Sequence, residues 1–136
     1  MTQVSVGIFF NNGKVLLCQR KPTSHYPLKW EFPGGKAEAD ESPADCLRRE
    51  LHEELGINAE VGKLFHRQHA AYPDNKNFDV SYFMISSYQG SIVNNVFESI
   101  TWVTLAELVL YDILEGNRDV VQQLLKVYSN IESGAC

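Results

Sequence analysis

The stretch from Gly35 to Ile57 constrains the fold and the chemistry of this chain more than any other part of it. It opens with glycine, which suits a tight turn, and a helix follows. Ser42 supplies a hydroxyl N-cap, Pro43 takes the first helical position, and Asp45 lies at the positive end of the helix dipole. Gly56 marks the other end of the helix. We therefore predict a glycine-rich turn followed by a single helix.

The predicted helix carries an apolar stripe and an acidic arc beside it. At about 100° per residue, four apolar side chains share one face, which we expect to be packed. They are Ala44, Leu47, Leu51 and Leu55. Three glutamates, which we expect to stay unpacked, lie on the adjoining arc: Glu50, Glu53 and Glu54. Like charges at this spacing cost about 0.2–0.5 kcal/mol per pair, so the acidic arc is either a solvated face softened by Arg49 or a cation site.

Nine positions of the stretch fit the pattern G-x5-E-x7-R-E-U-x-E-E-x-G-U, in which U is an aliphatic residue. The matching residues are Gly35, Glu41, Arg49, Glu50, Leu51, Glu53, Glu54, Gly56 and Ile57. This pattern resembles the box of the Nudix hydrolase family, and weaker similarity to the MutT-type branch extends from the first strand to the last helix. The resemblance implies an α/β fold, a Nudix-type α/β/α sandwich with a small mixed β-sheet between helices.

Composition and charge limit the other possibilities. The 136 residues are 44% hydrophobic and 21% charged, which suits one globular core. We expect a single domain over residues 1–130 and a frayed tail over 131–136. The net charge of −5 argues against binding to duplex nucleic acid or to an anionic membrane. A polyphosphate substrate would need cations to approach the acidic helix.

Cysteine usage and the N-terminal sequence bear on the cellular compartment. Cys18, Cys46 and Cys136 are odd in number and form no CxxC motif, so neither a disulfide framework nor a zinc site is indicated. Free thiols suit a reducing compartment. The sequence shows no signal peptide and no apolar run of about 20 residues. We expect a cytoplasmic protein, and the choice between monomer and homodimer stays open.

Strand signals occur on both sides of the predicted helix. Val4–Phe10 and Lys14–Gln19 flank an Asn-Asn-Gly turn, which predicts a hairpin. Alternating apolar residues predict further strands over 58–69, 78–87 and 100–104. Gly62-Lys63 forms a polar interruption within the first of these three ranges.

Two more helices are expected near the C-terminus. Thr104 and Glu107 have capping-box spacing and predict a short helix. A terminal helix should open at Asn117, which is a good N-cap residue. Its apolar stripe consists of Val120, Val121, Leu124, Leu125 and Tyr128.

The resemblance implies a divalent cation held by carboxylates. Magnesium prefers a few carboxylate ligands completed by water and phosphate, and Mn²⁺ is an alternative. The implied ligands are the Gly34 carbonyl with Glu50, Glu53 and Glu54. Family precedent makes one box glutamate the base that deprotonates the attacking water, and here we assign that role to Glu50 or Glu53. A tight turn that simply joins strand to helix is the other interpretation of Gly34.

Three further charged residues receive roles from the resemblance. Glu98, just before the last expected strand, corresponds loosely to an additional metal ligand, and an exposed glutamate is the other interpretation. Glu41 and Arg49 are assigned a structural role, a salt bridge that ties the loop to the helix.

Substrate contacts are likewise carried over position by position. In MutT-type members an arginine and a histidine at the positions of Arg20 and His25 touch the nucleotide, and the run Glu31-Phe32-Pro33 lines the base site. Gly34, which follows this run, is assigned to substrate binding as well as to the metal. Asn117 corresponds to an asparagine that reads a purine edge, for which an amide that donates and accepts is suited. Tyr72 is a further candidate for stacking on the base. Four of these residues also have a structural interpretation. In it, Arg20 caps a strand end and His25 is a solvated loop residue. Tyr72 is then a core residue and Asn117 a helix cap.

The function implied is magnesium-dependent hydrolysis of a nucleoside triphosphate to the monophosphate and pyrophosphate, with an oxidised purine such as 8-oxo-dGTP as the favoured substrate. A divalent cation neutralises phosphate oxygens, aligns a water and stabilises the leaving group. Alternatives are a CTP or other pyrimidine triphosphate pyrophosphohydrolase, an ADP-ribose hydrolase and a non-catalytic nucleotide-binding sensor. The complete set of glutamates favours an enzyme over the sensor.

Overall fold

The computed structural model describes the backbone of residues 1–134 and the side chains of residues 1–128. The first half contains β1 (Thr2–Asn11), β2 (Lys14–Gln19), β3 (Trp30–Glu31), β4 (Gly34–Lys36) and helix α1 (Pro43–Leu55). The second half contains β5 (Asn58–Ala71), β6 (Asn77–Gln89), β7 (Ser99–Thr104), the 3₁₀ turns η1 (Ala106–Leu110) and η2 (Glu115–Asn117), and helix α2 (Arg118–Gly134).

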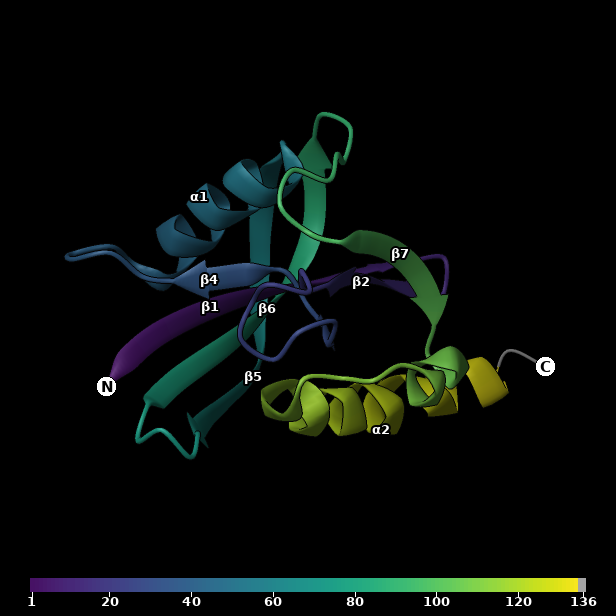
Figure 1. Cartoon of the computed structure of the whole chain (residues 1–136). Helices are drawn as coiled ribbons and strands as arrows, with labels where there is room; N and C mark the ends of the chain where they lie inside the picture. The colour runs from purple at the N-terminus through teal and green to yellow at the C-terminus, as the bar shows by residue number, and fades with distance from the viewer. Residues whose placement is uncertain (135–136) are drawn as a thin grey trace.

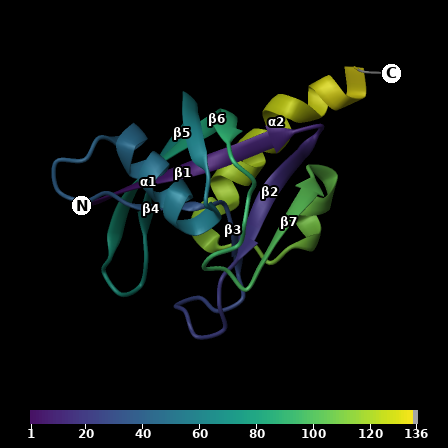
Figure 2. The same cartoon turned by 90° about the horizontal axis from the view of Figure 1, so that it is seen from above.

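The strands form one mixed sheet between the two α-helices. Strands β3, β2, β1, β6 and β5 lie side by side in that order, while β4 also pairs with β1 and β7 with β2. Strands β1 and β6 are parallel, and the other pairs are antiparallel. Helices α1 and α2 lie on opposite sides of β1 (Figures 1 and 2). The predicted α/β/α sandwich with a mixed sheet is therefore confirmed.

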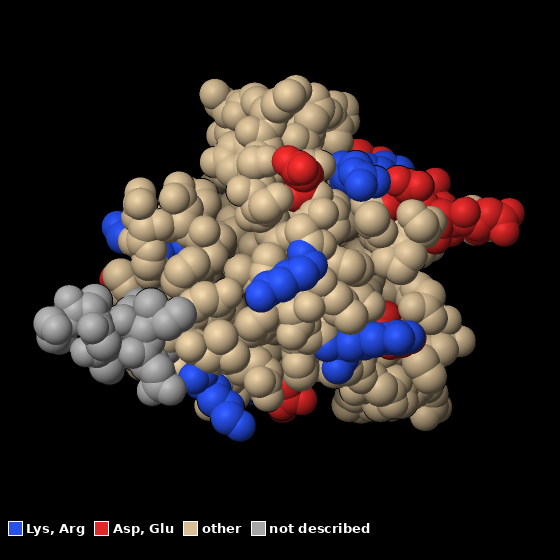
Figure 3. All heavy atoms as spheres, turned by 180° about the vertical axis from the view of Figure 1, so that it is seen from behind, with Lys and Arg blue, Asp and Glu red and all other residues tan. Residues whose placement is uncertain are grey.

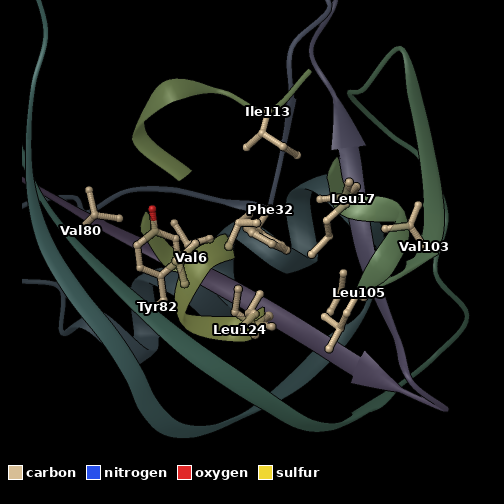
Figure 4. Packing of buried hydrophobic residues seen from close by; sticks show 14 residues of the cluster. Val6, Leu17, Phe32, Val80, Tyr82, Val103, Leu105, Ile113 and Leu124 are labelled. Carbon is tan, nitrogen blue, oxygen red and sulfur yellow. The ribbon is translucent and has the colours of Figure 1, made fainter. Parts of the chain in front are cut away.

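Alternation along the central strands divides the core into two clusters. On β2, Leu16 and Cys18 belong to the cluster under α1, together with the leucines of that helix. Val15 and Leu17 point the other way and pack in the cluster that contains Leu124 of α2, part of which Figure 4 shows. The two periodicities of strand and helix thus place one apolar layer on each side of the sheet.

Strands β1 and β2 pair only near their turn and then diverge. Phe10 lies opposite Val15 in the hairpin, as predicted. Farther from the turn, β1 pairs with β4 and β2 pairs with β3. The run from Trp30 to Lys36 therefore fills the fork between the first two strands. The expected glycine-rich turn is wrong, because Gly34–Lys36 hydrogen-bonds to β1 as a strand.

Helix α1 begins and ends where the sequence predicts. The Ser42 hydroxyl accepts a hydrogen bond from the Asp45 amide, and Gly56 ends the helix in the left-handed conformation with φ of 70°. The apolar face is shifted, however, because Ala44 is half-buried and Cys46 is fully buried. Strand β4 passes beneath the first turn on that side, where the carbonyl of Gly35 lies 3.5 Å from the Cys46 sulfur.

The C-terminal elements differ in detail from the prediction. Thr104 and Glu107 form the reciprocal bonds of a capping box, but the turns that follow, Ala106–Leu110, are 3₁₀. Helix α2 continues to Gly134 and so includes residues 131–134 of the predicted tail. Residues 135–136 lie outside the described part of the chain. No helix among the described residues is long and apolar enough to cross a membrane.

Leu51→Ala should lower the free energy of unfolding by about 2–5 kcal/mol, because it removes a fully buried side chain between α1 and the sheet. Urea denaturation followed by circular dichroism measures the loss. Leu110→Ala is the same change at a side chain that is 78% exposed, and it should cost less than about 0.5 kcal/mol. Equal losses in the two variants would contradict the core position of Leu51.

Candidate active site

A cavity of about 310 Å³ opens at the fork between β1 and β2. Its apolar wall comes mainly from β1 and β6, with Val4, Val6, Val80 and Tyr82. The lining includes seven of the eight residues predicted to bind substrate: Arg20, His25, Glu31, Phe32, Gly34, Tyr72 and Asn117. Glu54 of the predicted metal site lines the same cavity. Residues far apart in sequence are therefore brought together in one concave site.

Pro33 and Glu98 lie outside the lining of this cavity. Pro33 is buried and outside the cavity lining, because its carbonyl is turned back to accept a hydrogen bond from the Gly7 amide of β1 at 2.8 Å. Glu98 is exposed and outside the lining, and its amide donates to the carbonyl of Gln19 at 2.9 Å. The structure thus favours the alternative interpretation of Glu98 as a surface glutamate.

Two glycines let the carboxylates of α1 reach β4. A Cβ atom at Gly34, where φ is 153°, would lie 2.7 Å from the Cα of Val6. A Cβ atom at Gly35 would lie 2.5 Å from a carboxylate oxygen of Glu50. The Gly34 amide donates to the carboxylate of Glu54 at 3.1 Å. Only a strand without side chains at these positions fits between β1 and the acidic side of α1.

The sequence predicts that all three glutamates of α1 are unpacked, but the structure packs two of them. The side chain of Glu50 is only 16% exposed, whereas that of Glu53 is 56% exposed. Glu54 is half-buried and points into the cavity wall, where it meets Gly34. The expectation was wrong for Glu50 and Glu54 because β4, which the sequence pattern did not reveal as a strand, covers that side of the helix.

The carboxyl groups of Glu31, Glu50 and Glu54 lie near one another, with too little positive charge beside them to neutralise all three. Burial raises the pKa of Glu54 to about 9, and the carboxylates of Glu50 and Glu31 act in the same direction. Burial also raises the pKa of Glu50, against the opposing effect of Arg49. The pKa of Glu31 is raised by burial as well, although Arg20 lies 3.2 Å away. Such a set favours either protonation or the binding of a cation.

Arg49 connects the acidic residues to the preceding loop. Its guanidinium binds both carboxylate oxygens of Glu41, at 2.8 and 2.9 Å, and this hydrogen bonding lowers the pKa of Glu41 to about 2. The salt bridge expected between these two residues is present. The same guanidinium contacts Glu50 at 2.9 Å and Glu53 at 3.4 Å, and donates to the carbonyl of Lys36 at 3.0 Å. Arg49 therefore offsets repulsion along the helix.

The oxygen donors at this site fit a hard divalent cation in their chemistry. Glu50, Glu53 and Glu54 of α1 would hold the ion with the carbonyl of Gly34. In the described part of the chain, no three His, Cys, Asp or Glu side chains converge on one point. Arg49 binds Glu50 and Glu53, whereas the carboxylate of Glu54 accepts a hydrogen bond from the Gly34 amide. The ligand set stays a prediction.

Asn117 is a cavity residue and not a helix cap. Its side-chain oxygen accepts a hydrogen bond from the amide of Phe32 at 3.0 Å, and its side-chain nitrogen donates to the hydroxyl of Tyr82 at 3.0 Å. Both groups of the amide are therefore bonded to the fork and to β6 rather than to the first turn of α2. The N-cap interpretation is wrong because these buried partners also need hydrogen bonds.

Tyr82 is the main site residue that the sequence analysis missed. The alternation of Phe78, Val80 and Tyr82 along β6 was visible, and it predicts that the three side chains share one face. All three line the cavity. Nothing in that pattern indicates that the Tyr82 hydroxyl meets Asn117, because the two residues lie 35 positions apart.

A family model described as NUDIX domain matches residues 1–124. The chain belongs to the NUDIX domain family. It is similar to the 8-oxo-dGTP diphosphatase of Escherichia coli K12, with 29% identity over 92% of this chain and 97% of the relative. It is also similar to the CTP pyrophosphohydrolase of the same strain, with 33% identity over 92% of each chain.

Solved structures agree with the assignment to the NUDIX family. The solution structure of the E. coli ORF135 protein matches with a TM-score of 0.83 and 29% identity over 93% of this chain and 91% of that one. A MutT structure, from work on Aliivibrio salmonicida and Vibrio cholerae, matches with a TM-score of 0.78 and 29% identity over 92% of this chain and 97% of that one.

Family membership confirms the enzyme class expected from the sequence, a NUDIX pyrophosphohydrolase acting on nucleoside triphosphates, and sets aside the non-catalytic sensor. NUDIX hydrolases generally use divalent metals, in agreement with the crowded carboxylates beside Gly34. Figure 3 shows one face on which acidic side chains gather at one edge beside basic ones, while the other Lys and Arg side chains lie apart from one another. The described residues form no continuous basic surface on that face.

The pKa of Glu54 predicts how the metal-free protein responds to pH. Because the folded-state pKa is raised from 4.5 to about 9, the stability from this group is fully present below about pH 4.5 and is lost as the pH rises toward 9. Glu54→Gln keeps the neutral form at every pH. With a chelator present, the unfolding free energy of the variant relative to the wild type should therefore be higher at about pH 8 than at about pH 5.

Urea denaturation of both proteins at the two pH values measures this difference. The matched control is the same pair of proteins with excess Mg²⁺ in place of the chelator, where the advantage of the variant at the higher pH should shrink. A variant whose relative stability is the same at both pH values in chelator would contradict a half-buried, protonated Glu54.

Proposed function

We propose that this NUDIX hydrolase converts an oxidised purine nucleoside triphosphate, such as 8-oxo-dGTP, into the monophosphate and pyrophosphate with Mg²⁺. One observation supports this most strongly. The amide of Phe32 binds Asn117, and two residues farther along the same run the amide of Gly34 binds Glu54. The amide of Asn117, which is suited to read a base, and the carboxylate of Glu54, at the edge of the acidic site, therefore share one cavity.

The base is proposed to meet the amide of Asn117. After its bonds to Phe32 and Tyr82, this amide keeps one N–H and one oxygen lone pair. Guanine presents two acceptors, O6 and N7, on its major-groove edge. Oxidation at C8 places a hydrogen on N7, so the same edge presents an acceptor beside a donor. The amide can then pair with both atoms of the oxidised base but with only one atom of guanine.

The triphosphate is proposed to extend from the base toward α1. A bound divalent cation neutralises phosphate oxygens and lowers the pKa of water at the site. Glu50 or Glu53 takes the proton of the attacking water. The new P–O bond forms as the bond to the oxygen between the α and β phosphorus atoms breaks, which gives the monophosphate and pyrophosphate. Arg20, held by Glu31 and by the carbonyl of His25 at 2.7 Å, is positioned at the cavity to contact the nucleotide.

A second candidate substrate is CTP. The relative named CTP pyrophosphohydrolase is 33% identical over 92% of each chain. Cytosine presents a donor, its N4 amino group, beside the N3 acceptor, so an amide can pair with it in the same way. Pairing with Asn117 alone therefore does not separate an oxidised purine from cytosine, and the comparison of substrates has to include both.

A panel of 8-oxo-dGTP, dGTP, CTP, UTP and ADP-ribose tests this proposal. We expect the highest kcat/KM with 8-oxo-dGTP, with monophosphate and pyrophosphate released in equal amounts. Chromatography of the nucleotide and a separate assay of pyrophosphate measure the two products. A higher kcat/KM with CTP would replace the first candidate by the second, and release of orthophosphate from any triphosphate would contradict the proposed bond cleavage.

Glu53→Gln should lower Mg²⁺-dependent kcat by about 10²–10⁴-fold, because it removes a proposed metal ligand or base. The fold should be intact, since the side chain is 56% exposed. Steady-state kinetics and circular dichroism measure the two effects. Glu60→Gln, the same change at an exposed residue of β5, serves as the control. A fully active Glu53→Gln enzyme would refute the assignment of the site.

A further inference from the structure

Tyr82 carries a hydroxyl group at the edge of an otherwise apolar cluster. The residue is fully buried and packs in the core beside α2. Figure 4 shows its ring next to Val6, with the hydroxyl directed away from Leu124. That hydroxyl donates to the carbonyl of Gly116 at 2.9 Å and accepts from Asn117 at 3.0 Å. Tyr82, Gly116 and Asn117 all line the cavity, so this polar group belongs to the wall of the site.

The directions of these hydrogen bonds follow from their partners. A carbonyl only accepts, so Gly116 takes the single proton of the Tyr82 hydroxyl, and the same carbonyl receives a second bond from Gln68 at 2.8 Å. The Tyr82 oxygen is then left as an acceptor, and it must face the N–H side of the Asn117 amide. On the other side the Phe32 amide only donates, so it must face the oxygen of Asn117. The amide therefore has one allowed orientation.

Two fixed partners also define the plane of the amide. A single hydrogen bond to Phe32 would leave the Asn117 amide free to tilt about that bond. A second bond, from the opposite end of the amide to Tyr82, removes this freedom. Burial of Tyr82 raises the pKa of its phenol, which keeps the hydroxyl protonated and the order of donors unchanged over the working pH range.

Resting on the proposed function, we propose that Tyr82 is a specificity-determining residue that acts through Asn117. Its hydroxyl holds the Asn117 amide so that one N–H and one lone pair meet the edge of the base in a set order and plane. Tyr82 is thus a positioning residue. It does not touch the reacting phosphate, and its effect is on the choice among bases.

Tyr82→Phe isolates the hydroxyl, because the ring that fills the core is kept. The ratio of kcat/KM for 8-oxo-dGTP to that for dGTP should fall about three- to tenfold, the usual effect of losing one neutral hydrogen bond. This ratio does not depend on the fraction of folded enzyme, so a merely structural role would leave it unchanged. Tyr111→Phe removes the same atom from a residue that packs on Trp30 outside the cavity lining, and it should leave the ratio unchanged.

A double-mutant cycle with Asn117→Ala tests whether Tyr82 acts through Asn117. Asn117→Ala alone should lower the ratio at least as much as Tyr82→Phe. In the Asn117→Ala background, Tyr82→Phe should cause no further change. The inference is overturned if Tyr82→Phe leaves the ratio unchanged, if the two effects multiply independently, or if Asn117→Ala has no effect.

The wild-type enzyme separates this inference from the proposed function. If it hydrolyses CTP better than 8-oxo-dGTP, the oxidised-purine proposal fails, and the same cycle is then measured on the ratio of CTP to UTP. A fall of that ratio in Tyr82→Phe and in Asn117→Ala, without a further fall in the double variant, supports the role of Tyr82. An unchanged ratio in Tyr82→Phe overturns it for this substrate as well.

Discussion

The site depends on the close approach of strand β4 to β1 and α1, which is possible because β4 has no side chains at Gly34 and Gly35. Strand β4 lies against β1 at Ser5 and Val6 and beneath the acidic side of α1, and a Cβ atom at either glycine would collide with one of these neighbours. The same approach brings the Gly34 amide to Glu54 and makes room for the carboxylate of Glu50. Fold and site therefore share one steric requirement.

Charge at the site follows from that packing. Because β4 covers part of α1, carboxyl groups that would be solvated on a free helix are crowded, and the pKa of Glu54 is raised by burial and by its acidic neighbours. Arg49 and Arg20 each bind part of the acidic set, at Glu41 and Glu31. The remaining negative charge makes the site receptive to a divalent cation and, through it, to a polyphosphate.

The sequence alone specified the elements whose signals are local. Ser42, Pro43 and Gly56 predict the ends of α1 because capping and backbone conformation depend on a few adjacent residues. The Asn-Asn-Gly turn predicts the hairpin of β1 and β2 in the same way. The spaced glutamates and arginine also identify the family, since they lie close together on and just before one helix. Seven of the eight predicted substrate residues line the cavity.

The tertiary structure decided which side chains the remaining residues meet. Local propensity makes Asn117 a helix cap, yet its amide binds Phe32 and Tyr82, which are distant in sequence. Three-residue strand β4 has no periodicity to detect, so the burial of Glu50 was not predictable. The sequence by itself determined the acidic helix and its ends. Only the folded sheet decided where the glutamates and Asn117 bond, because those partners come together when β1 and β2 diverge.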